Sequence, residues 1–207
     1  KNKRTDTECS LMGKDNKLLL FCGPSGSGKT TIVHDLLASD PRLKFSVSAT
    51  TRNKRANETD GEDYHFISVE EFKRRIANDE FVEWEEVYTN GFYGTLKSEI
   101  ETIWSEGKIP VFDVDVEGGI KIKSIFSEQL LAVFVRPPSI EILHQRLKAR
   151  NSETPESFKA RIVKAEHELT YADKFDHIIV NDTLEKALEE AHRLVNEFVK
   201  VTVKGEN

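Results

Sequence analysis

The sequence predicts an α/β fold in which helices cover both faces of a central parallel β-sheet. Short apolar runs alternate along the chain with segments of helical periodicity. A short run without polar interruption is typical of a strand that is buried on both faces, and parallel sheets are built from such strands. The predicted strands are residues 17–22, 45–49, 109–115, 130–135 and 177–180.

The helical segments are recognised from apolar residues that recur every three or four positions and therefore share one helix face. Strands that alternate with such helices are joined by crossover connections, which makes the sheet parallel and places helices on both of its sides. The prediction is therefore a three-layer core. The apolar groups are Ile32, Val33, Leu36 and Leu37; Ile140, Leu143 and Leu147; and Leu184, Ala187, Leu188, Ala191, Leu194 and Val195.

Two segments depart from this alternation. Residues 48–95 are polar and rich in arginine and acidic residues, which indicates a mixed α+β insertion. Residues 139–170 are almost wholly helical in pattern and carry spaced arginines. The core then comprises residues 15–47, 96–138 and 171–207, and the polar residues 1–14 are expected to form a disordered tail.

The composition excludes several classes of protein. The 207-residue chain has a formal net charge of −6, whereas wrapping a nucleic acid needs a basic excess, so no nucleic-acid partner is expected. Cys9 and Cys22 are too few for a disulfide framework, and no apolar run reaches the roughly 18–20 residues of a membrane span. We expect a cytoplasmic protein without a membrane partner, either a monomer or a homodimer.

Residues 23–30, GPSGSGKT, match the full pattern G-x-x-x-x-G-K-[ST] between a predicted strand and a predicted helix. Gly23, Gly26 and Gly28 allow the loop to curl with its N–H groups pointing inward. Lys29 can reach the β- and γ-phosphates, and the Thr30 hydroxyl can bind Mg²⁺. The pattern predicts a nucleoside triphosphate site, and a simple glycine-rich turn is the less favoured alternative.

A second site on the insertion decides which reaction the loop supports. Arg52 and Arg55 carry forked cations and Tyr64 a directional hydroxyl, and together these groups can hold a phosphate. Considered alone, such a stretch is more often a solvated basic loop. The hypothesis of a phosphate site therefore needs support from the rest of the chain.

Further polar residues suit a guanine base. The carboxylates of Glu83 and Asp115 can accept from its N1–H and its C2 amine, and the hydroxyls of Ser48 and Thr95 can meet its O6. Asp113 also lies at the end of a predicted strand, where open α/β sheets bind ligands. A helix N-cap or a structural ion pair is the alternative explanation for Asp113.

Five stretches in this order resemble the guanylate kinase family over residues 17–200: GPSGSGKTT, SVSATTRNKRANETDGEDYHF, FVEWEEVYTNGFYGT, FDVDVEGG and RLKARNSETPESFKARI. Many families share the first stretch, whereas the second and third are specific to this one. The resemblance implies a P-loop NTPase core, a GMP-binding insertion and a helical lid. It also implies the Mg²⁺-dependent reaction ATP + GMP ⇌ ADP + GDP, with deoxy-GMP as a further acceptor.

The resemblance assigns roles to individual residues. It implies an ATP site of Gly23, Pro24, Ser25, Gly26, Ser27, Gly28, Lys29, Thr30, Thr31, Arg146, Arg150 and Asn181, with Thr30 holding Mg²⁺ through the ATP phosphates. It implies a GMP site of Ser48, Arg52, Arg55, Tyr64, Glu83, Tyr93, Thr95 and Asp115. The implied catalytic residues are Lys29, Arg52, Arg150 and Arg161.

The chain departs from the family pattern at two places. Phe92 stands where the family commonly has the first of two tyrosines, and residues 116–119, VEGG, differ beside the nucleotides. Trp84 and Trp104 are interpreted as core residues. The histidines His65, His144 and His167 have no metal-ligand spacing.

Three alternatives compete with a guanylate kinase. Another nucleoside monophosphate kinase is disfavoured because Glu83 and Asp115 would repel the N1 lone pair of adenine. A catalytically inactive guanylate-kinase-like docking module typically lacks the phosphate loop that this chain retains. A regulatory GTPase needs an N-K-x-D motif, of which IIVNDTLEKA offers only part.

Overall fold

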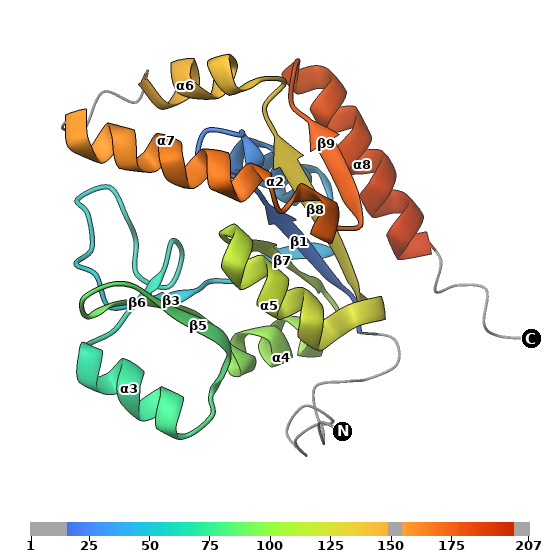
Figure 1. Cartoon of the computed structure of the whole chain (residues 1–207). Coiled ribbons are helices and arrows are strands. Elements are labelled where there is room, and N and C mark those ends of the chain that lie inside the picture. Colours follow the sequence, from blue (N-terminus) through green and yellow to red (C-terminus); the bar gives the residue numbers. More distant parts are fainter. Residues whose placement is uncertain (1–15, 149–154, 201–207) are drawn as a thin grey trace, which may run out of the picture.

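The computed structural model describes residues 16–148 and 155–200, and Figure 1 shows their arrangement. A five-stranded sheet with the order β2-β7-β1-β8-β9 forms the centre, and each of its strand pairs is parallel. The predicted α/β fold with a central parallel sheet is therefore confirmed. The strands are β1 Leu18–Cys22, β2 Leu43–Phe45, β7 Ile109–Asp113, β8 Leu130–Arg136 and β9 His177–Val180.

Helices pack on both faces of this sheet. One face carries α2 (Lys29–Ser39) and α8 (Leu184–Lys200), and the other carries α4 (Lys97–Ser105) and α5 (Val116–Phe126). Successive side chains of β1 alternate between the two sides, so Leu19 and Phe21 belong to the first core. Leu18, Leu20 and Cys22 belong to the second. All five side chains are fully buried, which explains why this strand contains no polar residue.

A smaller mixed sheet follows β2 in the chain, with the order β4-β3-β6-β5. Its strands are β3 Ala49–Thr50, β4 His65–Phe66, β5 Phe81–Tyr88 and β6 Gly91–Leu96. The helix α3 (Val69–Ala77) covers it through Phe72, whose ring stacks on those of Phe81 and Phe92. This sheet therefore has a small core of its own, separate from the cores of the large sheet.

The helices α6 (Ile140–Lys148) and α7 (Pro155–Leu169) pack on each other through Leu143, Leu147 and Ala165. Figure 1 shows this pair, in orange, above the smaller sheet and on the same side of the central sheet. Two short 3-10 helices, η1 (Ser127–Gln129) and η2 (Ala172–Lys174), precede β8 and β9. Across the described parts of the chain, no helix is long and apolar enough to cross a membrane.

Several expectations about single elements were wrong. The predicted strand 45–49 is divided, because β2 ends at Phe45 in the large sheet and β3 begins at Ala49 in the smaller one. An apolar run does not reveal that the chain changes sheets within it. Trp84 was expected in the core but is 40% exposed on β5, and β9 was expected to be buried on both faces but buries only Ile179. An apolar pattern shows which residues can be buried together, but not how far the neighbouring elements extend to cover them.

Candidate active site

The glycine-rich loop connects β1 to α2. Gly23, Gly26 and Gly28 all have positive φ angles, of 142°, 88° and 93°. A Cβ atom on Gly23 would lie 2.1 Å from the Val135 carbonyl oxygen, and one on Gly28 would lie 2.2 Å from Nδ2 of Asn181. Both the backbone conformation and the close packing therefore require glycine. Because α2 begins at Lys29, its unpaired N–H groups and the positive end of its dipole lie at the loop.

Side chains from three other elements hold this loop. The Asn181 amide after β9 donates to the Ser27 carbonyl over 2.8 Å. Arg146 of α6 donates to the Asn181 carbonyl over 3.0 Å, and Arg161 of α7 donates to Oγ of Ser25 over 2.9 Å. The structure thus brings Asn181, Arg146 and Arg161 to the loop, whereas Arg150 lies outside the described residues.

Asp113 gains a clear position that its place in the sequence left open. It ends β7 opposite Phe21 of β1, and its Oδ2 accepts from the Thr30 hydroxyl over 2.6 Å. Nζ of Lys29 lies 3.6 Å from the other carboxylate oxygen. The sequence showed an acidic residue at the end of a predicted buried strand, but not that this strand lies beside β1.

The hydroxyl of Thr30 and the carboxylate of Asp113 suit Mg²⁺. This ion prefers oxygen ligands, and it commonly binds through one or two protein oxygens, waters and the phosphates of a substrate. In the described part of the chain, no three His, Cys, Asp or Glu side chains form a group that would hold a metal by themselves. The donor set therefore fits a metal ion that a phosphate ligand shares.

A cavity of about 400 Å³, here called the loop cavity, lies between the loop and α7. Lys29, Thr30 and Asp113 line one part of it, and Arg161, Lys164 and Glu168 of α7 line another. Sequence reasoning missed Lys164 and Glu168. They lie three and seven positions after Arg161, so helical spacing from that arginine would have placed them on the same face.

A second cavity of about 270 Å³, here called the carboxylate cavity, adjoins the first. Its walls include five residues predicted to form the second site: Ser48, Tyr64, Glu83, Tyr93 and Asp115. A Cβ atom on Gly118 would lie within 3.4 Å of Oε2 of Glu83 and of Oδ1 of Asp115. The two carboxylates thus flank the same glycine, whose missing side chain leaves room for a ligand to approach them.

Each of these two carboxylates is oriented by one protein donor. Thr95, which is fully buried, donates from its hydroxyl to Oε1 of Glu83 over 2.9 Å. The Gly118 N–H donates to Oδ1 of Asp115 over 3.0 Å, because Asp115 is the N-cap of α5. Burial raises the pKa of Glu83, and the hydrogen bond from Thr95 partly offsets this effect.

Arg52 is held by a bidentate ion pair. Its guanidinium donates to both carboxylate oxygens of Glu58, one of them over 2.7 Å, and lies 5.0 Å from the centre of the Tyr64 ring. The Arg52 hydrogen bonds lower the pKa of Glu58 to about 2, so this carboxylate stays charged at neutral pH.

Arg52 and Arg55 are not among the described residues that line the two cavities. Arg52 lies against the ring of Tyr64, and Tyr64 lines both cavities. The Arg55 side chain is exposed, while its backbone N–H also donates to Glu58. Glu58 was not predicted as a site residue. It lies six positions after Arg52, in the same polar stretch.

A phosphate loop beside a second cavity lined by the carboxylates of Glu83 and Asp115 defines the class of this protein as a P-loop nucleoside monophosphate kinase. Residues 15–198 match the sequence model of the family described as guanylate kinase. The chain belongs to the guanylate kinase family.

Known relatives agree with this assignment. The guanylate kinase of Bacteroides fragilis is 50% identical over 185 residues, which cover 89% of this chain and 91% of the relative. That of Bacteroides thetaiotaomicron is 47% identical over 190 residues, which cover 92% of this chain and 93% of the relative. The crystal structure of guanylate kinase from Anaplasma phagocytophilum matches with a TM-score of 0.70 and 29% identity, over 94% of this chain and 90% of that one.

Proposed function

We propose that this chain transfers the γ-phosphoryl group of ATP to GMP, with ATP in the loop cavity and GMP in the carboxylate cavity. The observation that carries this proposal is that the two cavities adjoin. Both are lined by Tyr64, Asp113, Val114 and Asp115 at the carboxyl end of β7. Two nucleotides bound there would bring their phosphate groups together beside Lys29.

On the donor side, the backbone of residues 23–30 and the α2 dipole would bind the ATP phosphates, as the positive φ angles and the helix start support. Lys29 would neutralise the transferring group. Arg146 and Arg161, which donate to the Ser27 carbonyl and the Ser25 hydroxyl of the loop, would bind the phosphates. We assign Arg150 to the residues that bind the ATP phosphates on the resemblance alone. We assign Asn181 the role of holding the loop in place through its hydrogen bond to the Ser27 carbonyl.

Thr30 and Asp113 would hold Mg²⁺ together with the phosphates. When bound, this ion neutralises charge on the phosphate oxygens and aligns them for transfer. The fit rests on the two oxygen donors that approach each other within 2.6 Å.

On the acceptor side, Arg52, Arg55, Tyr64 and Tyr93 would bind the phosphate of GMP. The carboxylates of Glu83 and Asp115 would accept from the base, and Ser48 would meet its O6. Because the Thr95 hydroxyl hydrogen already goes to Glu83, we assign Thr95 the orientation of that carboxylate.

The chemistry needs little from a general base. The phosphate of GMP carries about −1.5 to −2 charges at neutral pH, so its oxygen can attack the γ-phosphorus directly. The new bond joins that oxygen to the γ-phosphorus, and the bond to the β–γ bridging oxygen breaks, so that ADP leaves with the charge. The protein must therefore position two polyanions and exclude water.

We include the predictions of a cytoplasmic location and of a monomer or homodimer in this proposal.

The test is ADP formation from Mg-ATP with GMP, deoxy-GMP, AMP, UMP and dTMP offered separately. We expect turnover with GMP and deoxy-GMP, and none in a folded Lys29→Ala variant. Turnover with AMP or dTMP instead would contradict the roles of Glu83 and Asp115. Binding of both nucleotides without any turnover would favour the inactive docking module.

A further inference from the structure

Lys164 occupies the junction of the two cavities. It lies on the same face of α7 as Arg161, and it lines the loop cavity with Lys29. Its Nζ lies 3.6 Å from Oδ2 of Asp115 and 3.8 Å from Oε1 of Glu168. One cation of α7 thus contacts a carboxylate that also lines the second cavity.

The surroundings keep this lysine charged. Burial alone would lower the pKa of Lys164, but the charges of Asp115, Glu168 and Glu85 outweigh that effect and the pKa is raised. Its side chain is 52% exposed, so the four-carbon stem has room to move. Lys164 is therefore a mobile cation that carboxylates hold at one edge of a phosphate-binding cavity.

The contact with Lys164 is made by the Asp115 carboxylate oxygen that has no other hydrogen bond among the described contacts. Oδ1 of Asp115 is occupied by the Gly118 N–H over 3.0 Å, whereas Oδ2 faces Lys164. Because Oδ1 already accepts this hydrogen bond, a guanine that donates to Asp115 finds the larger acceptor capacity at Oδ2, 3.6 Å from Nζ of Lys164. The lysine and the base therefore compete for one oxygen atom.

We infer that Lys164 couples the two substrate sites: it pairs with Asp115 while the acceptor is absent and turns to the phosphates in the loop cavity once the base binds Asp115. The inference rests on the proposed function for the identity of the two ligands. It makes Lys164 a substrate-binding residue of the donor side that the acceptor releases. Glu168 is then the positioning residue that keeps the lysine at the junction when Asp115 is taken.

A consequence follows for the two binding equilibria. GMP alone must displace a cation from Asp115, so it binds more weakly than it would without Lys164. A phosphate ligand already in the loop cavity attracts the displaced lysine, so each ligand favours the binding of the other. Such coupling is reciprocal by thermodynamic linkage.

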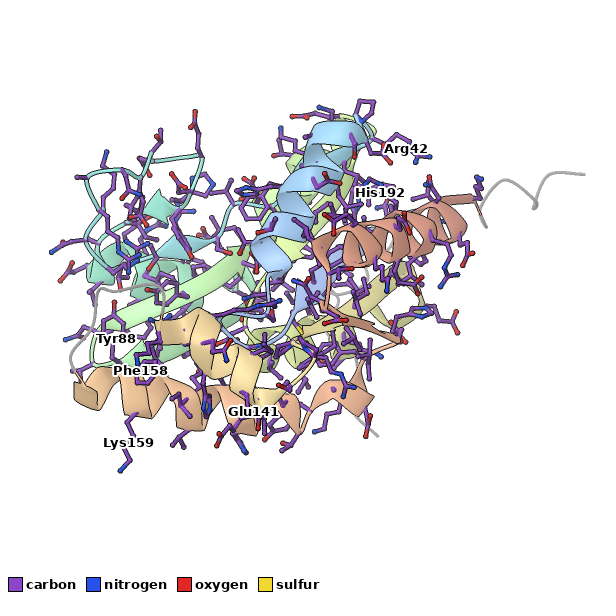
Figure 2. All side chains as sticks on the ribbon, turned by 90° about the horizontal axis from the view of Figure 1, so that it is seen from above. Arg42, Tyr88, Glu141, Phe158, Lys159 and His192 are labelled. Carbon is purple, nitrogen blue, oxygen red and sulfur yellow. The ribbon has the colours of Figure 1, made fainter. Side chains whose placement is uncertain are left out.

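The test compares the wild-type protein with Lys164→Met, which keeps the apolar stem and removes the charge. Lys159→Met is the matched control, because Lys159 lies on the same helix and Figure 2 shows it pointing away from the body of the protein. Titration calorimetry measures GMP binding alone and with saturating MgADP. Turnover with Mg-ATP and GMP is measured in parallel.

We expect the K164M variant to bind GMP alone about two- to fivefold more tightly, the size of a half-exposed ion pair. Its kcat should fall about tenfold, since one cation on the phosphates is lost. The effect of MgADP on the GMP dissociation constant should disappear. Lys164→Arg should restore the coupling, and K159M should match the wild type in every measurement.

Wild-type coupling and kcat in K164M would overturn the inference even if the wild type phosphorylates GMP. Weaker GMP binding in K164M would also overturn it, because this result would make Lys164 an acceptor ligand. A wild type that binds GMP without turnover would refute the proposed function, and the calorimetry would still decide the inference. Failure to bind GMP would refute both.

Discussion

Replacing Glu168 with glutamine removes a charge from a nearly solvent-free position on α7 and keeps the shape of the side chain. Glu168 is 8% exposed, and its carboxylate lies 3.8 Å from the ammonium group of Lys164. Burial raises its pKa from 4.5 to about 6, with Asp115 adding repulsion and Lys164 opposing the shift. The ionised carboxylate therefore destabilises the folded state.

The sign and size of the effect follow from these pKa values. Below the unfolded value of 4.5, both states are protonated and Glu168 costs nothing. As pH rises from 4.5 to about 6, the unfolded state loses this proton while the folded state still holds it, so stability falls over this range and levels off above it. The cost reaches about 2 kcal/mol above pH 7, and the Glu168→Gln variant avoids it.

Chemical unfolding at pH 7.5 and pH 4.5 measures this difference. We expect E168Q to be more stable than the wild type by about 2 kcal/mol at pH 7.5 and by about 0.4 kcal/mol at pH 4.5. For a chain of this size, the melting temperature at pH 7.5 should rise by about 4–8 °C. The control Glu189→Gln, an exposed carboxylate on α8, should change stability by less than about 0.5 kcal/mol.

Two results would refute the reasoning. E168Q that is no more stable at pH 7.5 would show that Lys164 fully compensates the buried charge. An equal gain at both pH values would show that the stabilisation comes from packing and not from titration.

Three further predictions concern the proposed reaction. Arg52→Ala should lower kcat/KM for GMP about 100-fold and leave the affinity for MgADP unchanged. The control is Arg42→Ala, because Arg42 also makes a bidentate ion pair, with Asp40 at the end of α2, and this variant should keep the kcat/KM of the wild type. Equal losses in the two variants would exclude a specific role of Arg52. Thr95→Val should move the acid limb of the kcat/KM profile to higher pH. The hydrogen bond from Thr95 lowers the pKa of Glu83, so its removal raises that pKa; an unmoved limb would contradict this. Chelation by EDTA should abolish turnover and added Mg²⁺ restore it, and turnover that survives chelation would exclude the metal.

The loop and the alternation of elements could be predicted because their physics is local. Consecutive residues carry the glycine conformations, the helix start and the lysine, so their spacing alone defines the phosphate site. The same holds for β1, in which every residue is buried. The prediction was wrong at residues 45–49, because the division of that run between two sheets depends on the partners of each part.

The sequence by itself determined the class of core, the phosphate loop and the residue types that suit a phosphate and a guanine. Only the tertiary structure decided that Asp113 meets Thr30, that Glu58 clamps Arg52 and that Lys164 stands between Asp115 and Glu168. Helical spacing relates Lys164 to Glu168, but nothing in the chain between them relates Lys164 to Asp115. That contact exists because α7 packs beside the carboxyl end of β7, and the balance of charge at the junction follows from this packing.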